Sequence, residues 1–98
     1  MIIIEVRKTE HFTQWIDGLH DIRARARILV RIERLTAGNP GDVKAVGGGV
    51  LELRIDYGPG YRVYYKNHGR RVAILLAGGD KRTQASDIKT ALRLAQNL

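Results

Sequence analysis

Cysteine is absent from this 98-residue sequence, and only two prolines are present. Without cysteine, the chain has no disulfide framework, no cysteine-ligated zinc site and no thiol nucleophile. Long apolar runs are also missing. The longest, residues 72–77, has six residues, whereas a membrane-spanning helix needs about 20. The sequence therefore predicts no membrane segment.

A basic leader is missing as well. Residues 1–7 carry no positive charge before their apolar stretch, which meets an acidic residue at Glu5. A secretory signal is therefore not expected. A cytoplasmic location is the resulting prediction.

Negative charge is scarce, because 10 Asp and Glu residues face 17 Lys and Arg residues and leave a net charge of +7. This surplus favours polyanions such as nucleic acid as partners, with acidic protein surfaces as the alternative. Hydrophobic residues make up 44% and charged residues 28% of the chain, which excludes a disordered polyelectrolyte. The length predicts one domain, residues 1–98, with one small core.

Hydrophobic periodicity predicts one strand and two helices in the first half of the chain. Residues 2–7 are rich in β-branched side chains and predict a strand buried on at least one face. Residues 12–19 have apolar side chains at helical spacing, and Thr9 can cap this helix. The longest periodic segment covers residues 20–37, and Gly38 ends it.

The helix predicted over residues 20–37 has two different faces. At about 100° per residue, its apolar side chains gather on one wide face: Ile22, Ala24, Ile28, Leu29, Ile32 and Leu35. Four arginines gather on the opposite side: Arg23, Arg27, Arg31 and Arg34. We expect the apolar face to pack on a sheet, whereas the arginine face either contacts nucleic acid or is simply solvated.

Beyond residues 39–41 the apolar period changes from 3.6 to 2, which predicts strands. The expected strands cover residues 42–46, 50–55, 61–66 and 72–77. The uniformly apolar last strand is expected to be central and to stop at Gly78 and Gly79. Helical spacing returns from Thr83 to the C-terminus. This order predicts an α+β fold with a mostly antiparallel sheet.

Simple catalytic signatures are absent. The three histidines have no metal-binding spacing, and Ser86 has no legible His and Asp partners. The glycine runs at residues 47–49 and 78–79 lack the Lys-Ser/Thr of a phosphate-binding loop and are interpreted as turns. The sequence therefore predicts neither a metal nor a small-molecule cofactor.

What remains is positive charge on the sheet, where residues 61–82 hold six Lys and Arg side chains against a single acid. Tyrosines interleave with these cations, a combination typical of surfaces where bases stack and arginines hold the backbone. Strand alternation places Tyr64 on the face of Arg62. It predicts core positions for Tyr61 and Tyr65.

Two arginines are expected to lie directly opposite each other. If the hairpin turns around Gly58, Arg54 and Arg62 are cross-strand neighbours, and like charges in such a pair repel. An anion such as phosphate between them would remove the repulsion. Alternatively, one of the arginines pairs with Glu52 or Asp56.

Three stretches of the chain point to a family. They are residues 49–55 (GVLELRI), 58–65 (GPGYRVYY) and 75–84 (LLAGGDKRTQ), the last followed by Asp87-Ile88. These stretches resemble the RelE/ParE superfamily of toxins, and most of all its HigB-like branch of addiction module killer proteins. Trp15, the helix around residues 24–34 and the turn at residues 38–42 are also similar, so the resemblance covers almost the whole chain.

The resemblance implies a RelE-like fold, with two N-terminal helices packed on a twisted, mostly antiparallel sheet of four to five strands and a C-terminal helix. It implies the toxin of a type II toxin–antitoxin pair, with a cognate antitoxin that covers its basic surface. Many relatives bind mRNA on the ribosome and cut it without metal or cofactor, the ribose 2′-oxygen attacking the neighbouring phosphate. An mRNA endoribonuclease (mRNA interferase) is therefore expected. The alternatives are a ParE-like inhibitor of DNA gyrase and a module that binds only its partner.

The resemblance also assigns candidate site residues. Arg62 matches the phosphate-binding arginine of the family, and Arg54 stands where some relatives have a catalytic lysine. Arg82 matches a second cation for the transition state. Glu52 stands where those relatives have another lysine, and it could act as a base or pair with Arg54. Apart from the resemblance, the pattern of cations and tyrosines gives the candidate RNA-binding residues, which are Lys81, Tyr64, Lys66, Arg23 and Arg27.

One position departs from the family pattern. Ile88 corresponds to the tyrosine or histidine that several active relatives have near the C-terminus, and it cannot transfer a proton. Tyr64 or His68 could replace that group. Otherwise catalysis would rest on cationic stabilisation of the transition state.

Overall fold

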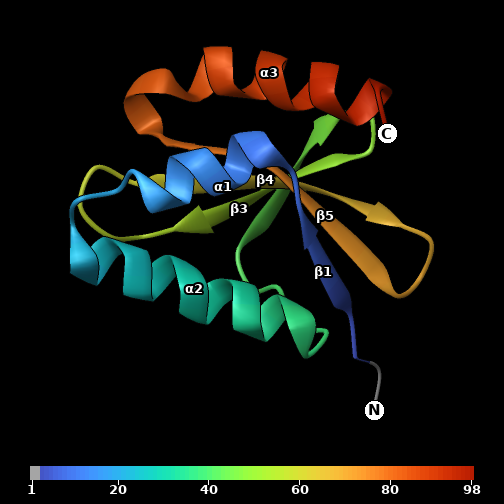
Figure 1. Ribbon diagram of the computed structural model, residues 1–98, viewed down its shortest axis with the longest axis horizontal. Coiled ribbons are helices and arrows are strands. Elements are labelled where there is room, and N and C mark those ends of the chain that lie inside the picture. Colours follow the sequence, from blue (N-terminus) through green and yellow to red (C-terminus); the bar gives the residue numbers. More distant parts are fainter. Residues whose placement is uncertain (1–2) are drawn as a thin grey trace.

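The computed structural model of the protein describes residues 3–98 and contains a five-stranded sheet in the order β1-β5-β4-β3-β2 (Figure 1). Along the chain the elements are β1 (Glu5–Lys8), α1 (Glu10–Asp17), α2 (Ile22–Thr36), β2 (Val43–Gly47), β3 (Val50–Ile55), β4 (Tyr61–His68), β5 (Val72–Asp80), a 3-10 turn η1 (Lys81–Thr83) and α3 (Gln84–Gln96). All strand pairs are antiparallel except β1 with β5, which is parallel. The predicted α+β class with a mostly antiparallel sheet is confirmed.

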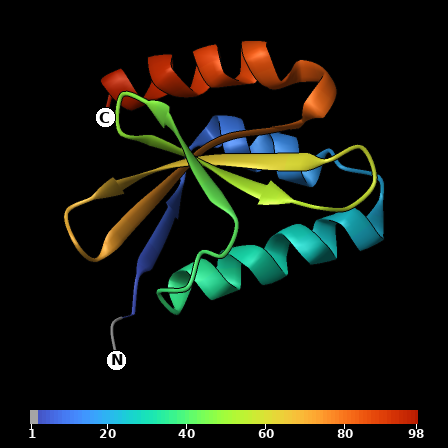
Figure 2. The same ribbon diagram turned by 180° about the vertical axis from the view of Figure 1, so that it is seen from behind.

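The helices cover the two faces of the sheet separately. Figures 1 and 2 show α1 and α2 on one face and α3 on the other. The first face is packed by side chains such as Phe12, Ile28 and Leu53. The second face has its own small core, in which Val50 and Tyr64 pack against α3. The sheet is therefore the middle of three layers, and a polar group between β3, β4 and α3 is shielded from water.

Helix caps confirm the predicted cap at Thr9 and the predicted end of α2, whereas α2 begins at Ile22, two residues later than predicted. The Thr9 hydroxyl accepts a hydrogen bond from the Phe12 amide at 3.1 Å and donates one to the Leu76 carbonyl at 2.7 Å, which ties α1 to β5. Asp21 caps α2 in the same way. At the other end, Gly38 has φ 83°, a conformation that glycine adopts without strain. Within residues 3–98, no helix is both long and apolar enough to span a bilayer.

The apolar face of α2 is narrower than the sequence predicts. Ala24, Ile28, Ile32 and Leu35 are buried, but Ile22 and Leu29 are 79% and 44% exposed. These two lie about 100° or more around the helix from Ile28. A single helix lying on a sheet buries only the stripe nearest to that sheet, so both side chains are left at its margins.

Strand β1 lies at the edge of the sheet, beside β5. Ile4 and Val6 are half-buried and Glu5 and Arg7 are exposed, as expected for a strand covered on one face. The described strand begins at Glu5, later than predicted, and residue 2 of that prediction lies outside the described residues.

Strand β5 lies between β1 and β4, which confirms the predicted central strand, but it does not stop at Gly78. It continues to Asp80, so the interpretation of Gly78 and Gly79 as a turn is wrong. The two glycines are needed because both layers approach the strand closely. A Cβ atom at Gly78 would overlap the Trp15 ring of α1, and one at Gly79 would overlap the Asp87 carboxylate of α3.

The close approach of the Trp15 ring to Gly78 leads to a prediction about stability. Gly78→Ala should lower the free energy of unfolding by about 1–3 kcal/mol, because the methyl group displaces the Trp15 ring from its contacts with Phe12 and Tyr61. Urea unfolding followed by circular dichroism measures the change. If the clash is the cause, the double variant G78A/W15L should be less destabilised than the sum of its two single variants. Additive effects would contradict it.

Candidate functional site

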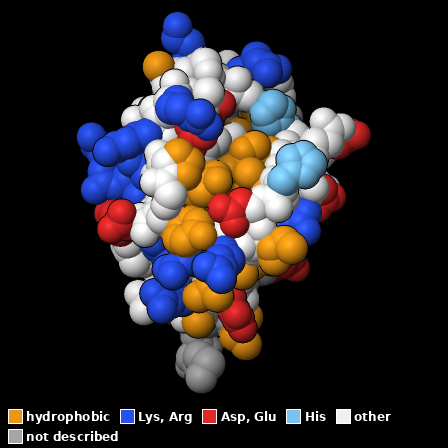
Figure 3. Space-filling model, turned by 90° about the vertical axis from the view of Figure 1, so that its left-hand side faces the viewer, with side chains coloured by type: hydrophobic (Ala, Val, Ile, Leu, Met, Phe, Trp, Pro, Cys, Tyr) orange, Lys and Arg blue, Asp and Glu red, His pale blue; other side chains and the backbone are white. Residues whose placement is uncertain are grey.

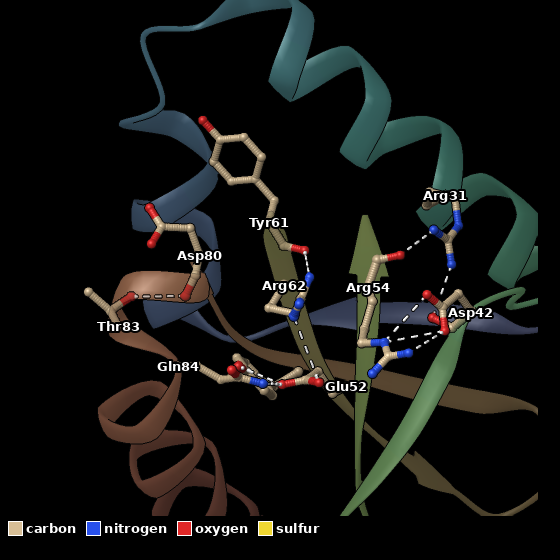
Figure 4. Close-up of polar contacts among 10 residues, drawn as sticks. Arg31, Asp42, Glu52, Arg54, Tyr61, Arg62, Asp80, Thr83 and Gln84 are labelled. Carbon is tan, nitrogen blue, oxygen red and sulfur yellow. Dashed lines mark hydrogen bonds and ion pairs between the residues drawn. The ribbon is translucent and has the colours of Figure 1, made fainter. Parts of the chain in front are cut away.

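The two arginines of the β3–β4 hairpin lie opposite each other as predicted, since Arg54 pairs in register with Arg62. Beside them is a groove of about 360 Å³, lined by Asp42, Arg54, Asp56, Gly60, Arg62 and Lys81. We call this the Arg62 groove (Figure 4). Three of its lining side chains are cations from three different elements: β3, β4 and η1.

Arg62 is held in place by a buried carboxylate. Its side chain is only 10% exposed, and its Nε lies 3.8 Å from Oε1 of Glu52, whose own side chain is completely buried. Oε2 of Glu52 accepts hydrogen bonds from the Tyr64 hydroxyl at 3.0 Å and from Nε2 of Gln84 at 2.7 Å. Because Gln84 is the first residue of α3, the carboxylate is oriented by β4 and α3 together.

The ion pair leaves hydrogen-bonding capacity unused on Arg62. At 3.8 Å the contact with Glu52 is longer than a hydrogen bond, and Nε of Arg62 has no hydrogen-bond partner within residues 3–98. Nη1 donates to the Tyr61 carbonyl oxygen at 3.2 Å. The terminal nitrogen Nη2 makes no hydrogen bond in the described chain, so it is available to an anion in the groove.

Arg54 and Arg62 each form an ion pair with a different carboxylate. The sequence had left open whether one of them pairs with Glu52 or with Asp56. Arg62 pairs with Glu52, and Arg54 pairs with Asp42, with 3.2 Å between Nη2 and Oδ1. Neither arginine pairs with Asp56. The Arg54 side chain is 38% exposed, so an incoming anion can replace Asp42 at little cost.

Comparison with known proteins identifies the family. The family model described as Phage derived protein Gp49-like (DUF891) matches residues 14–98. The chain belongs to this family. An uncharacterized protein of Haemophilus influenzae (strain ATCC 51907 / DSM 11121 / KW20 / Rd) is 53% identical over 95 residues, which cover 97% of this chain and 96% of that protein.

Among solved structures, a mutant of the E. coli toxin RelE in the free state has a similar fold. The TM-score is 0.67 at 15% sequence identity, over 90% of this chain and 97% of RelE. At this identity the similarity concerns the fold. The predicted RelE-like fold is confirmed for this Gp49-like protein.

The structure changes the interpretation of two candidate residues in the Gp49-like protein. Glu52 and Tyr64 have no exposed surface, so a carboxylate base at Glu52 and a base-stacking ring at Tyr64 are both incompatible with this arrangement. Burial, and secondarily the neighbouring Glu52 carboxylate, raise the pKa of Tyr64 well above its usual value of about 10. Both residues instead position Arg62.

The other candidates are distributed over the surface. Lys81 lines the Arg62 groove. Arg82 is 80% exposed and turns to Asp80, with 2.8 Å between Nη2 and Oδ2, and its hydrogen bonds lower the pKa of that carboxyl group. Lys66 is opposite Val50 at the far end of the hairpin. Arg82 and Lys66 therefore do not line the groove.

The arginine face of α2 is also corrected at one position. Arg31 is half-buried and donates hydrogen bonds to the carbonyl oxygens of Arg54, Pro40 and Asp42. Burial lowers its pKa. Arg31 thus joins α2 to the turn before β2 and supports the hairpin, while Arg23 and Arg27 remain exposed beside a second groove.

The candidate proton-transfer residues do not reach the groove. His68 is exposed at the far end of β4, and Tyr64 is completely buried. Ile88, which stands at the family's proton-transfer position, is half-buried against the core under α3. Among residues 3–98, no group of three or more His, Asp or Glu side chains is arranged to hold a metal ion. The ionisable groups that line the groove besides its cations are Asp42 and Asp56.

Three residues of the site were missed by sequence reasoning: Gln84, Asp42 and Asp56, the last of which was considered only as a partner for an arginine. Asp42 could have been found, because a hairpin centred on Gly48 places it opposite Arg54, and the Arg54 amide does donate to the Asp42 carbonyl oxygen at 3.0 Å. Gln84 ends the stretch 75–84 that resembles the toxin family, but nothing in the sequence connected it with Glu52. It follows Glu52 by 32 positions, and only the docking of α3 brings them together.

Figure 3 shows the end of the molecule where the β3–β4 connection and the start of α3 lie. Lys and Arg side chains form several patches around a central area of hydrophobic and a few acidic side chains. At this end of the molecule, cations therefore surround the region that contains the end of the hairpin.

The buried contact between Gln84 and Glu52 predicts a stability effect. Gln84→Ala should lower the free energy of unfolding by about 1.5–3 kcal/mol, because the completely buried Glu52 carboxylate loses one of its two hydrogen bonds from side chains. Urea unfolding measures it. The matched control is Gln14→Ala, which removes an amide–carboxylate hydrogen bond of 3.3 Å to Glu10 at an exposed site and should change stability by less than about 0.5 kcal/mol. Equal effects of the two substitutions would show that the hydrogen bond from Gln84 to Glu52 contributes no more to stability than an exposed one.

The buried tyrosines predict an alkaline loss of stability. Burial raises the pKa of Tyr61, Tyr64 and Tyr65 in the folded state, so the unfolded chain loses these protons first as the pH rises. The free energy of unfolding should therefore fall above about pH 10. Unfolding curves at pH 8 to 11 measure the fall. Tyr64→Phe should make it shallower, and an unchanged slope would show that Tyr64 ionises normally.

Proposed function

We propose that this Gp49-like protein is the toxin of a type II toxin–antitoxin pair and that it cleaves mRNA on the ribosome without a metal. The observation that carries the proposal is the nearly buried guanidinium of Arg62, which faces Glu52 in a groove shared with Arg54 and Lys81. The fold is similar to that of a protein named as the toxin RelE. Because three stretches of the sequence resemble HigB-like proteins, we also propose that it belongs to that branch.

The groove suits a phosphate that changes its charge distribution during reaction. The ribose 2′-oxygen forms a bond to phosphorus, the bond to the 5′-oxygen breaks, and negative charge accumulates on the non-bridging oxygens. Donors that are already oriented stabilise this charge without reorganising. Arg62 is oriented by Glu52, and the more exposed Arg54 and Lys81 supply two further cations.

The reaction also needs a group that accepts the 2′ proton and one that protonates the leaving 5′-oxygen. Glu52 and Tyr64 are buried, so they do not reach a substrate. Of the two carboxylates that line the groove, Asp42 is paired with Arg54. We therefore assign the 2′ proton to Asp56, which makes no ion pair within residues 3–98, and leave protonation of the leaving oxygen to Lys81 or to water.

The partner implied by this function is a cognate antitoxin protein. A surface with a net charge of +7 attracts an acidic segment. An antitoxin that covers the Arg62 groove would exclude RNA from it, and this exclusion is the simplest way to silence the toxin.

A ParE-like inhibitor of DNA gyrase is the second candidate. It is favoured by one observation: the groove contains neither a tyrosine hydroxyl nor an imidazole, so it has few groups for proton transfer. A binding function on the same cationic surface would need none.

The test is to induce the protein in bacteria without a partner and to map new mRNA 5′ ends while measuring plasmid supercoiling. We expect cuts in phase with codons inside translated regions, with supercoiling unchanged. Arg62→Ala should reduce the cuts by about 10²-fold or more. Arg62→Lys, which keeps a charge beside Glu52 but not the planar fork, should also be strongly impaired.

Arg93→Ala is the matched control, since it removes one exposed arginine from the last turn of α3. It should cut like the wild type. Relaxed or broken DNA with intact mRNA would move the function to gyrase. Full cutting by a folded Arg62→Ala variant would remove Arg62 from the site.

A further inference from the structure

A second groove lies along α2, beside the start of the β3–β4 connection. It has a volume of about 690 Å³, and its lining includes four arginines of α2 together with Val30, Ile55 and Asp56. We call it the α2 groove. Asp56 also lines the Arg62 groove, so the two grooves adjoin.

The exposed arginines of the α2 groove have no acidic partners. Arg23, Arg27 and Arg34 are exposed and form no ion pair within residues 3–98. They lie on one side of α2: Arg27 follows Arg23 by one turn, about 6 Å along the helix, and Arg34 follows Arg27 by two turns, about 10 Å. Such a row of uncompensated cations matches a ligand with repeated negative charge.

One arginine of the row is already stacked on an aromatic ring. The guanidinium carbon of Arg27 lies 4.6 Å from the centre of the Tyr57 ring, and Tyr57 is half-buried against the main core. The contact fixes both groups at the junction of α2 with the hairpin. An arginine plane on a fixed aromatic ring is a platform on which a nucleobase can stack.

We propose that the α2 groove binds single-stranded RNA, with the arginine row on its phosphates and one base stacked at Tyr57 and Arg27. The inference rests on the proposed function, because the RNA is the strand that passes through the Arg62 groove. An acidic protein segment is the competing occupant, since Val30 and Ile55 add apolar surface. RNA is favoured because the row continues into a second cationic groove and contains a stacking platform.

The experiment measures binding of a fluorescent 2′-O-methyl RNA decamer, which cannot be cut, to the full chain by anisotropy. The variant R23Q/R27Q should raise the Kd about tenfold or more, and should flatten the dependence of log Kd on log salt by about 0.7 per lost phosphate contact. The matched control is K89Q/R93Q, which removes the same charge from two exposed cations one turn apart on α3. The control should change the Kd less than threefold.

Stacking is tested separately. Tyr57→Leu should weaken binding about fivefold or more. A decamer without bases should bind the wild type about as weakly as the normal decamer binds the Tyr57→Leu variant. Its affinity should not fall further when the Tyr57→Leu variant replaces the wild type. Urea unfolding confirms that each variant is folded.

Three results would overturn the inference. Equal losses for R23Q/R27Q and K89Q/R93Q would mean that only net charge matters. If R23Q/R27Q leaves RNA affinity unchanged but loses binding to an acidic partner protein, the groove is a protein-binding site. If affinity depends on Arg62 alone, the inference fails while the proposed function stands. Conversely, RNA binding that depends on the α2 groove, combined with uncut mRNA in cells, would sink the endoribonuclease and keep the groove.

Discussion

The carboxylate of Glu52 is the group on which the site depends. It is completely buried, and it accepts hydrogen bonds from β4 through Tyr64 and from α3 through Gln84 while facing the guanidinium of Arg62. A buried charge is costly unless it is paired and hydrogen-bonded. The arrangement is therefore stable only when both strands, the last helix and Arg62 are in place together.

This constraint connects the layers of the fold to the proposed chemistry. The sheet separates the large core under α1 and α2 from the small core under α3, and Glu52 is hydrogen-bonded to Tyr64 of the small core. Because α3 shields the carboxylate, the charge of Arg62 is directed to the groove side. The other cations of the groove, Arg54 and Lys81, are more exposed than Arg62. The groove therefore combines one buried donor with two more accessible ones around the position proposed for the reacting phosphate.

Much of the fold could be predicted because it depends on local patterns. The caps at Thr9 and Gly38 and the opposition of Arg54 and Arg62 follow from spacing and turn position. The site could be predicted less completely. Strand alternation correctly put Glu52 and Tyr64 on the same face of the sheet as Arg62. It carried no information about whether another element packs on that face. Once α3 covers it, a candidate base and a candidate stacking ring become internal supports of Arg62.

The sequence by itself determined the basic charge, the order of the elements, the α+β class and the position of Arg54 opposite Arg62. Each of these depends on composition or on neighbours along the chain. Only the tertiary structure decided that Gly78 and Gly79 belong to a strand, that Glu52 is buried, and that Gln84 touches it. The physical reason is that burial and long-range hydrogen bonds depend on how α1 and α3 dock on the sheet. Docking joins residues that are far apart in the chain, and no local pattern encodes their distance.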